Sequence, residues 1–155
     1  MRRIFYTLLF IHSSLLASNL MYIDDVSVID EESFSIFIGT ENEDQFSAFQ
    51  FSIQLPEIVG FEYSHINLTS RASDHSVTGA VNQNIVTGIA YSLSGSPFIG
   101  SQGSIAEIVF NSCSGPLGEY PLILENAIVS GMDMVNLIDN TENGVLTITP
   151  NEIIE

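Results

Sequence analysis

Residues 48–55 read Ala48-Phe49-Gln50-Phe51-Ser52-Ile53-Gln54-Leu55, and this alternation of apolar and polar side chains decides the fold class. Successive side chains of a β-strand point to opposite sides of the sheet, so the apolar row shares one side. That row consists of Phe49, Phe51, Ile53 and Leu55, and the outward row consists of Gln50, Ser52 and Gln54. Pro56 ends the run because its ring nitrogen cannot donate to a neighbouring strand. The stretch predicts a strand with one face in a hydrophobic core.

Eight further stretches have the length and composition of strands, and turn residues separate them. They are residues 22–29, 34–38, 61–68, 76–81, 85–93, 105–113, 120–129 and 144–149. No stretch has the apolar spacing and the capping residues of an α-helix. Parallel α/β architectures need crossover helices, so we expect an all-β sandwich or barrel.

The first eighteen residues have the layout of a secretory signal peptide. Arg2 and Arg3 precede an apolar run over residues 4–17, and the small residues Ala17 and Ser18 follow. The run is shorter than a membrane span. We expect a signal peptide at residues 1–18, one domain at 19–150 and a short tail at 151–155, in a secreted or cell-surface protein. A retained N-terminal anchor is the alternative.

The charge of the chain excludes several classes of partner. The formal net charge is −16, and removal of residues 1–18 leaves Arg71 alone against 19 Asp and Glu, which gives −18 (1 − 19). A surface this acidic repels phosphate groups, so we expect no nucleic-acid partner and no binding to anionic lipid surfaces. We also expect no membrane insertion once the signal is removed. A basic or neutral protein, a polysaccharide or a divalent cation stays open as a ligand, and solubility alone also accounts for the charge.

The residues that carry catalysis in other proteins are sparse here. His65 and His75 lie in separate segments, and Cys113 is the single cysteine, for which we expect a buried and inert thiol. The acidic groups at 41–44 and 133–142 lack the spacing of an EF-hand loop. We therefore expect no catalytic residues, no cofactor and no metal site, and we interpret these acidic loops as solvated.

Three stretches, taken in order, are similar to cohesin-like modules of secreted bacterial proteins. Residues 48–53 resemble the family's G-F-Q-F-D-I strand, with Ala48 in place of the usual Gly. Residues 85–95 and 103–110 resemble its strand, Gly/Ser loop and G-x-L-A-x-I-x-F succession. Residues 118–122, 126–130 and 143–148 resemble its closing strands. The resemblance covers nearly all of residues 22–149 and implies a nine-strand jelly-roll β-sandwich, in which one sheet face docks a calcium-loaded dockerin module.

The candidate binding surface is a sheet face, and one of its strands is open to two registers. The alignment implied by the resemblance turns Val86, Gly88 and Ala90 inward. The outward residues are then Thr87, Ile89, Tyr91 and Leu93, an apolar stripe that would mark an interaction site. A shift by one residue would exchange the two sides and place Ile85, Ile89, Tyr91 and Leu93 in the core. Together with Gln50, Ser52 and Gln54, the outward stripe forms the candidate site.

Two binding functions are consistent with these residues. The first is a non-catalytic module that docks a dockerin-type partner in polysaccharide-degrading or cell-surface assemblies. The alternative is a carbohydrate-binding module that binds polysaccharide directly. The chain has no Trp and only five Tyr, which disfavours an aromatic platform for sugar rings.

Overall fold

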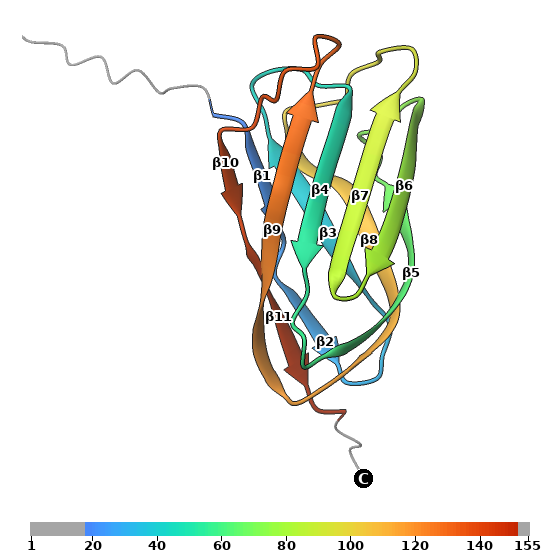
Figure 1. Cartoon of the computed structure of the whole chain (residues 1–155), viewed down its shortest axis with the longest axis vertical. Coiled ribbons are helices and arrows are strands. Elements are labelled where there is room, and N and C mark those ends of the chain that lie inside the picture. The colour runs from blue at the N-terminus through green and yellow to red at the C-terminus, as the bar shows by residue number, and fades with distance from the viewer. Residues whose placement is uncertain (1–17, 152–155) are drawn as a thin grey trace, which may run out of the picture.

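Two β-sheets pack face to face in the computed structural model, which describes residues 18–151 (Figure 1). The strands are β1 (Leu20–Ile23), β2 (Val26–Ile29), β3 (Phe34–Glu41), β4 (Ala48–Gln54), β5 (Gly60–Leu68), β6 (His75–Asn82), β7 (Ile85–Ser92), β8 (Gln102–Ser114), β9 (Gly118–Ser130), β10 (Asn140–Glu142) and β11 (Gly144–Thr149). One sheet has the order β10-β1-β3-β8-β5, and the other has the order β2-β11-β9-β4-β7-β6. The pairs β1–β10 and β2–β11 are parallel, and the other pairs are antiparallel.

The predicted buried row of β4 lies at the centre of the core. Phe49, Phe51, Ile53 and Leu55 are each at most 1% exposed. Apolar residues of β3 and β8 cover them from the five-stranded sheet, and Ile36, Ile38, Ile105, Ile108 and Phe110 are fully buried there. The all-β sandwich expected from the alternation is confirmed.

The chain has eleven strands within the described residues, where the resemblance implied nine. The predicted strand at 22–29 is two strands in different sheets, because its buried residues change from odd-numbered to even-numbered positions. Met21 and Ile23 are buried in β1, whereas Val28 is buried in β2. The chain crosses between the sheets at Asp24 and Asp25, where Asp25 Oδ1 accepts a hydrogen bond from the backbone N–H of Val145 at 2.8 Å. The other addition is β10, which lies in a segment expected to be a turn.

The expected burial of Cys113 is confirmed, because its side chain is fully buried at the end of β8. Burial and the neighbouring Asp30 carboxylate raise the pKa of its thiol. The predicted signal peptide at residues 1–18 lies outside the described residues except for Ser18, and the predicted tail at 151–155 lies outside them except for Asn151. Among residues 18–151, no helix is long and apolar enough to cross a membrane.

Candidate docking face

The strands β9, β4, β7 and β6 present one open side to solvent, toward the viewer in Figure 1. Side chains that point outward line up in four rows across these strands. The rows are Ser130–Ala48–Tyr91–Ser76, Ile128–Gln50–Ile89–Thr78, Glu125–Ser52–Thr87–Ala80 and Ile123–Gln54–Ile85–Asn82. We call these residues the outer face.

The register of β7 is the one in which the small residues point inward. Val86 and Ala90 are fully buried, and Gly88 is buried between them. A Cβ atom on Gly88 would lie 2.5 Å from Cζ of Phe51, so a glycine is required for the Phe51 ring to pack against β7. The alternative register, which would bury Ile89 and Tyr91, is not adopted.

A β-bulge in β9 adds an apolar residue to the outer face. Ser52 pairs with Glu125 and Gln50 pairs with Ile128, so β9 has one residue more than β4 in this interval. The extra residue is accommodated at Asn126, whose φ is +50°. Bulges bend a strand and redirect its side chains. Here the bulge changes the parity of β9, so that Val129 is buried and Ile128 points outward.

Large apolar side chains on the outer face are partly exposed. Tyr91 is 44% exposed and Ile89 is 38% exposed, and Ile123 and Ile128 have similar values. Ile89 and Ile128 lie in the same row on either side of Gln50. These four side chains therefore form a shallow apolar surface along the length of the sheet, which is the kind of surface that marks an interaction site.

The predicted polar row of β4 lies between these apolar side chains and is less exposed than expected. Gln50 and Gln54 are half-buried, and Ser52 is buried at 8% exposure. Ser52 lies on the central strand of the face, and its Oγ is 3.5 Å from Oγ1 of Thr87. The Gln54 amide donates to the backbone oxygen of Leu55 at 3.1 Å. β4 lies between β7 and β9, so neighbouring side chains on both sides reduce the exposure of this row.

The outer face is almost free of charge although the chain is strongly acidic. Among its residues, all of which the structure describes, Glu125 alone is ionisable apart from Tyr91. Most of the acidic side chains lie in loops or on the other sheet, where Glu62 and Glu107 accept hydrogen bonds from Asn111 and Asn67. Depletion of charge is characteristic of the centre of protein–protein interfaces.

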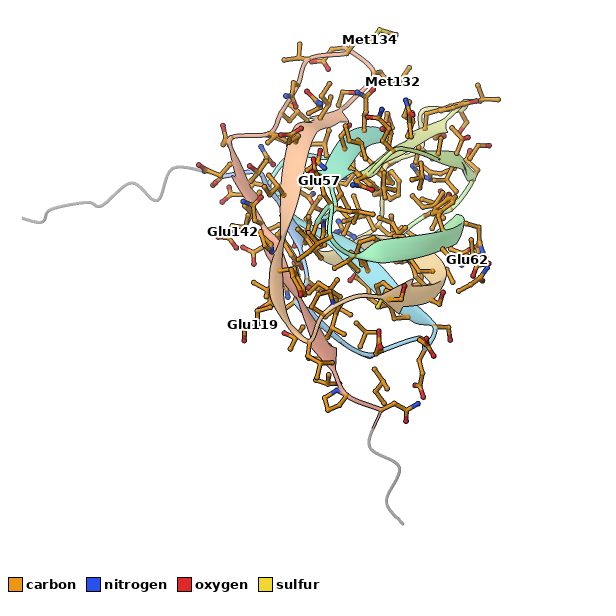
Figure 2. The ribbon with its side chains drawn as sticks, turned by 60° about the horizontal axis from the view of Figure 1, so that its bottom comes forward. Glu57, Glu62, Glu119, Met132, Met134 and Glu142 are labelled. Atoms are coloured by element: carbon orange, nitrogen blue, oxygen red, sulfur yellow. The ribbon has the colours of Figure 1, made fainter. Side chains whose placement is uncertain are left out.

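At one end of the outer face, two loops form a groove of about 400 Å³. The β7–β8 loop contributes Leu93, and the β9–β10 loop contributes Met132 and Met134. These three side chains are 80–90% exposed. Figure 2 shows Met132 and Met134 at the end of the molecule that carries this loop. Leu93 was the only one of the three that the sequence singled out.

Arg71 is the only Lys or Arg among residues 18–151, and it is buried rather than displayed. Its Nε donates to the backbone oxygen of Ile99 at 2.8 Å. Nη1 donates to Thr40 Oγ1 and to the Gly103 oxygen, and Nη2 donates to Asn42 Oδ1 and to the Gly100 oxygen. Burial lowers the pKa of this guanidinium, which still remains charged. Arg71 therefore holds the start of β8 to the end of β3 and contributes nothing to the outer face.

The two histidines among residues 18–151 have different surroundings. His65 is exposed, and its Nδ1 lies 2.9 Å from Oγ of Ser64. The ring of His75 packs on Phe98 with centroids 3.8 Å apart, and its Nε2 has no hydrogen-bond partner among the described residues. Burial lowers the pKa of His75. Within the described part of the chain, no group of three or more His, Cys, Asp or Glu side chains is arranged to hold a metal ion.

No protein-family model matches the sequence, and no curated protein is significantly similar to it. Solved structures do match the fold. A non-cellulosomal cohesin from the archaeon Archaeoglobus fulgidus superposes with a TM-score of 0.70 at 15% identity, over 86% of this chain and 92% of that one. The sixth cohesin of scaffoldin B from Acetivibrio cellulolyticus, solved in complex with a Cel5 dockerin, gives 0.71 at 12% identity, over 85% and 99% of the two chains. A Clostridium thermocellum cohesin in the Coh-OlpC–Doc435 complex gives 0.71 at 11% identity, over 86% and 95%.

This chain has a cohesin-like fold. At identities of 11–15%, these matches show the fold alone. The class of ligand has to be inferred from the surface residues of this chain. On this cohesin-like sandwich, the six candidate residues Gln50, Ser52, Gln54, Thr87, Ile89 and Tyr91 lie together on the outer face. Leu93 lies beyond the end of β7, in the adjoining groove. Sequence reasoning did not include Ile123, Ile128, Met132 and Met134.

Proposed function

We propose that this chain is a secreted, non-catalytic docking module whose outer face binds a dockerin-type protein. The observation that carries the proposal is the combination of exposed apolar side chains and missing charge on one flat sheet face. Ile89, Ile128 and Tyr91 are exposed in the two rows of that face nearest the groove, and Glu125 is its one carboxylate within the described residues. Several solved cohesins that share the fold are in complexes with dockerins, which supports a partner of this class.

The area of the outer face also favours a protein over a small ligand. Its four strands and four rows cover roughly 500 Å² of flat area, since strands lie about 4.8 Å apart and outward residues about 6.8 Å apart along a strand. A standard protein interface uses about 800 Å² from each partner. The outer face is therefore a large part of one side of such an interface. Direct binding of polysaccharide has less support, because Tyr91 is the one aromatic residue in the four rows.

Isothermal titration with dockerin modules encoded in the same genome, each loaded with calcium, tests the proposal. We expect at least one of them to bind. Ile89→Asp places a charge at the centre of the outer face and should weaken that binding at least a hundredfold. Phe37→Asp is a matched control, because Phe37 is 37% exposed and Ile89 is 38% exposed but Phe37 lies on the other sheet.

Two results would contradict the proposal. One is the absence of heat with every dockerin tested. The other is binding that Ile89→Asp and Phe37→Asp weaken equally, which would place the contact away from the outer face. Affinity electrophoresis in gels that contain soluble polysaccharides tests the carbohydrate-binding alternative. Retardation of the wild type that Ile89→Asp abolishes would show that the outer face binds polysaccharide.

A further inference from the structure

The groove beyond the outer face is built by segments that are far apart in sequence. The backbone N–H of Ser47 donates to the oxygen of Ser130 at 2.9 Å, and the N–H of Ser92 donates to the oxygen of Ser47 at 3.0 Å. These bonds hold the ends of β7 and β9 on either side of the start of β4. The loops that follow both strands therefore lie at the same end of the sandwich (Figure 1).

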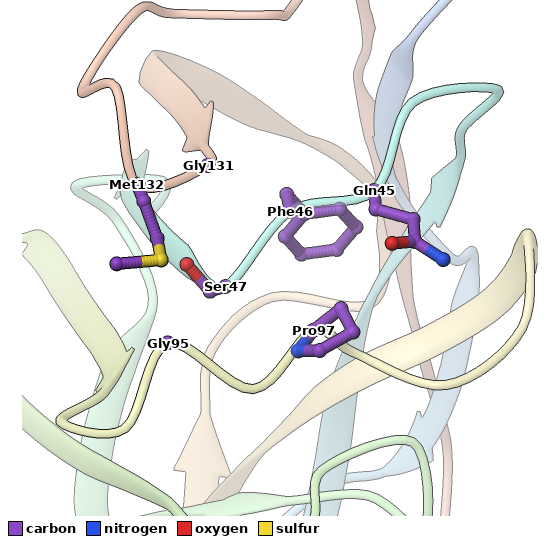
Figure 3. A pocket seen from close by; sticks show the side chains of 7 residues that line it. All are labelled: Gln45, Phe46, Ser47, Gly95, Pro97, Gly131 and Met132. Atoms are coloured by element: carbon purple, nitrogen blue, oxygen red, sulfur yellow. The ribbon is translucent and has the colours of Figure 1, made fainter.

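Met132 divides the space between these loops. Its side chain lies over Gly95, where a Cβ atom would be 2.8 Å from the Met132 sulfur. On one side is a hollow of about 170 Å³ with Phe46 and Pro97, which Figure 3 shows. On the other side is the larger groove, which opens toward Tyr91. Methionine is unbranched and flexible, so Met132 can move to fit an apolar side chain placed beside it.

The apolar residues of the groove are more exposed than those of the outer face. Leu93 is 90% exposed, Met134 is 88% exposed and Met132 is 80% exposed. Such a group of large apolar side chains at a loop end is unfavourable in water unless a partner covers it. The groove is also continuous with the outer face, because Tyr91 and Ala48 belong to both. Covering the groove would extend the flat area of roughly 500 Å² toward the 800 Å² of a standard interface.

The charges beside the groove are all negative. Asp133 lies between the two methionines in sequence, and its Oδ1 would be 3.6 Å from a Cβ atom on Gly131. Asp74 accepts hydrogen bonds from the hydroxyls of Ser92 and Ser94, and these bonds lower its pKa to about 2. Asp74 is therefore ionised at neutral pH. The single cation of the described residues, Arg71, is buried. A second copy of this chain would bring further negative charge and is disfavoured.

We propose that this groove binds an apolar side chain of the docking partner that is flanked by Lys or Arg. The proposal rests on the docking function given above and adds a second contact to it. The apolar side chain fills the space between Leu93, Met132 and Met134. The basic residues beside it lie near Asp74 and Asp133. The outer face supplies most of the contact area. The groove selects among partners by the one partner side chain that enters it.

Nuclear magnetic resonance of methionine methyl groups tests this directly. Among the described residues the chain has Met21, Met132 and Met134, and Met21 is fully buried in the core. Two kinds of probe are titrated: calcium-loaded dockerins from the same genome, and synthetic amphipathic helical peptides of Leu and Lys or of Leu and Glu. We expect a binding dockerin and the Lys peptide to shift the Met132 and Met134 signals and to leave Met21 unchanged. The Glu peptide should shift none of them.

A matched pair of variants locates the contact. Leu93→Ser should weaken binding of both the dockerin and the Lys peptide about tenfold. Leu117→Ser changes an exposed leucine in a turn between β8 and β9, and should alter affinity less than twofold. An unchanged Met21 signal in both variants shows that the core is intact.

The outcomes separate the two proposals. A dockerin that binds without shifting Met132 and Met134 overturns the groove contact and leaves the docking function in place. A Lys peptide that shifts both signals, with no dockerin binding, upholds the groove and overturns the dockerin-type partner. Equal shifts with the Lys and Glu peptides overturn the charge selection. If neither probe shifts the two signals, the groove contact is wrong.

Discussion

Replacement of Arg71 by Met tests whether the buried guanidinium holds the loops together. Arg71 is 8% exposed, and each of its five N–H groups has an acceptor. None of these acceptors is a carboxylate within the described residues. The contribution of Arg71 must therefore come from the fit of its planar donors to oxygen atoms at fixed positions rather than from an ion pair.

The magnitude follows from which acceptors can return to water. Thr40 is 1% exposed and Asn42 is 7% exposed, so removal of Arg71 leaves two buried oxygens short of a donor. Each such oxygen costs about 1–2 kcal/mol. The hydroxyl of Thr40 also donates to Asn42 Oδ1 at 3.3 Å, which offsets part of this cost. The oxygens of Ile99 and Gly100 belong to exposed residues and can be solvated. We expect Arg71→Met to lower the free energy of unfolding by about 3 kcal/mol.

Urea unfolding followed by circular dichroism measures this change. A loss of about 3 kcal/mol lowers the midpoint by about 1.5 M and the melting temperature by roughly 10 °C. Arg71→Lys should be nearly as destabilising, because an ammonium group cannot reach five acceptors arranged around a planar fork. A double-mutant cycle with Asn42→Ala should give a coupling energy of about 1 kcal/mol or more.

The result for Arg71→Lys decides between two explanations. A stability within about 0.5 kcal/mol of the wild type would mean that the charge alone matters, through its attraction to the acidic chain. The geometric argument would then be wrong. A change below about 1 kcal/mol for Arg71→Met would show that water replaces the guanidinium at all of its acceptors.

Three further predictions concern the core and its titration. Phe51→Ala should lower the free energy of unfolding by about 3–5 kcal/mol, whereas Gln50→Ala should change it by about 0.5 kcal/mol or less; equal effects in urea unfolding would contradict the register of β4. Gly88→Ala should cost about 1–3 kcal/mol by overpacking, because its new methyl group would clash with the Phe51 ring, and a neutral result by the same assay would mean that the ring moves freely. Burial lowers the pKa of His75 in the folded state, so on acidification the unfolded state binds a proton at a higher pH than the folded state does. The stabilising contribution of the neutral, buried His75 ring is therefore present above about pH 6.5 and is lost as the pH falls. His75→Gln should reduce the loss of unfolding free energy between pH 7 and 5. If the pH dependence of the variant equals that of the wild type, other groups cause the loss.

Local alternation was sufficient to predict the sandwich and most of its strands. Phe49, Phe51 and Ile53 follow a strict period of two, and no competing helical spacing occurs nearby. The same rule explains where the prediction differed from the structure. Met21 and Ile23 are odd-numbered and Val28 is even-numbered, so one continuous strand could not bury all three. That change of parity was visible in the sequence and indicates a crossing between the sheets.

The candidate site was predicted only in part, because its remaining residues depend on contacts between distant segments. Continuing the alternation of Leu122 and Leu124 along β9 would turn Ile128 inward and Val129 outward. The bulge at Asn126 reverses both, and nothing in the local pattern fixes its position. Met132 becomes part of a groove because a second loop, 37 residues earlier at Gly95, lies against it. The sequence Met132-Asp133-Met134 places two large apolar residues in a polar loop, and this was the one local pattern that pointed to the groove.

Charged and apolar side chains are separated on this molecule, and the separation bears on the docking function proposed above. Most acidic side chains lie on the other sheet and in the loops, whereas the outer face is uncharged except for Glu125 among the described residues. The field of a net charge of −16 acts over about 8–10 Å in salt and favours encounters with basic proteins. In the complex that we propose, exclusion of water by Ile89, Tyr91 and Ile128 would determine how long the partners stay bound. Because the acidic side chains and the apolar side chains of the outer face are different residues, substitutions that change the charge can leave the proposed apolar contact intact.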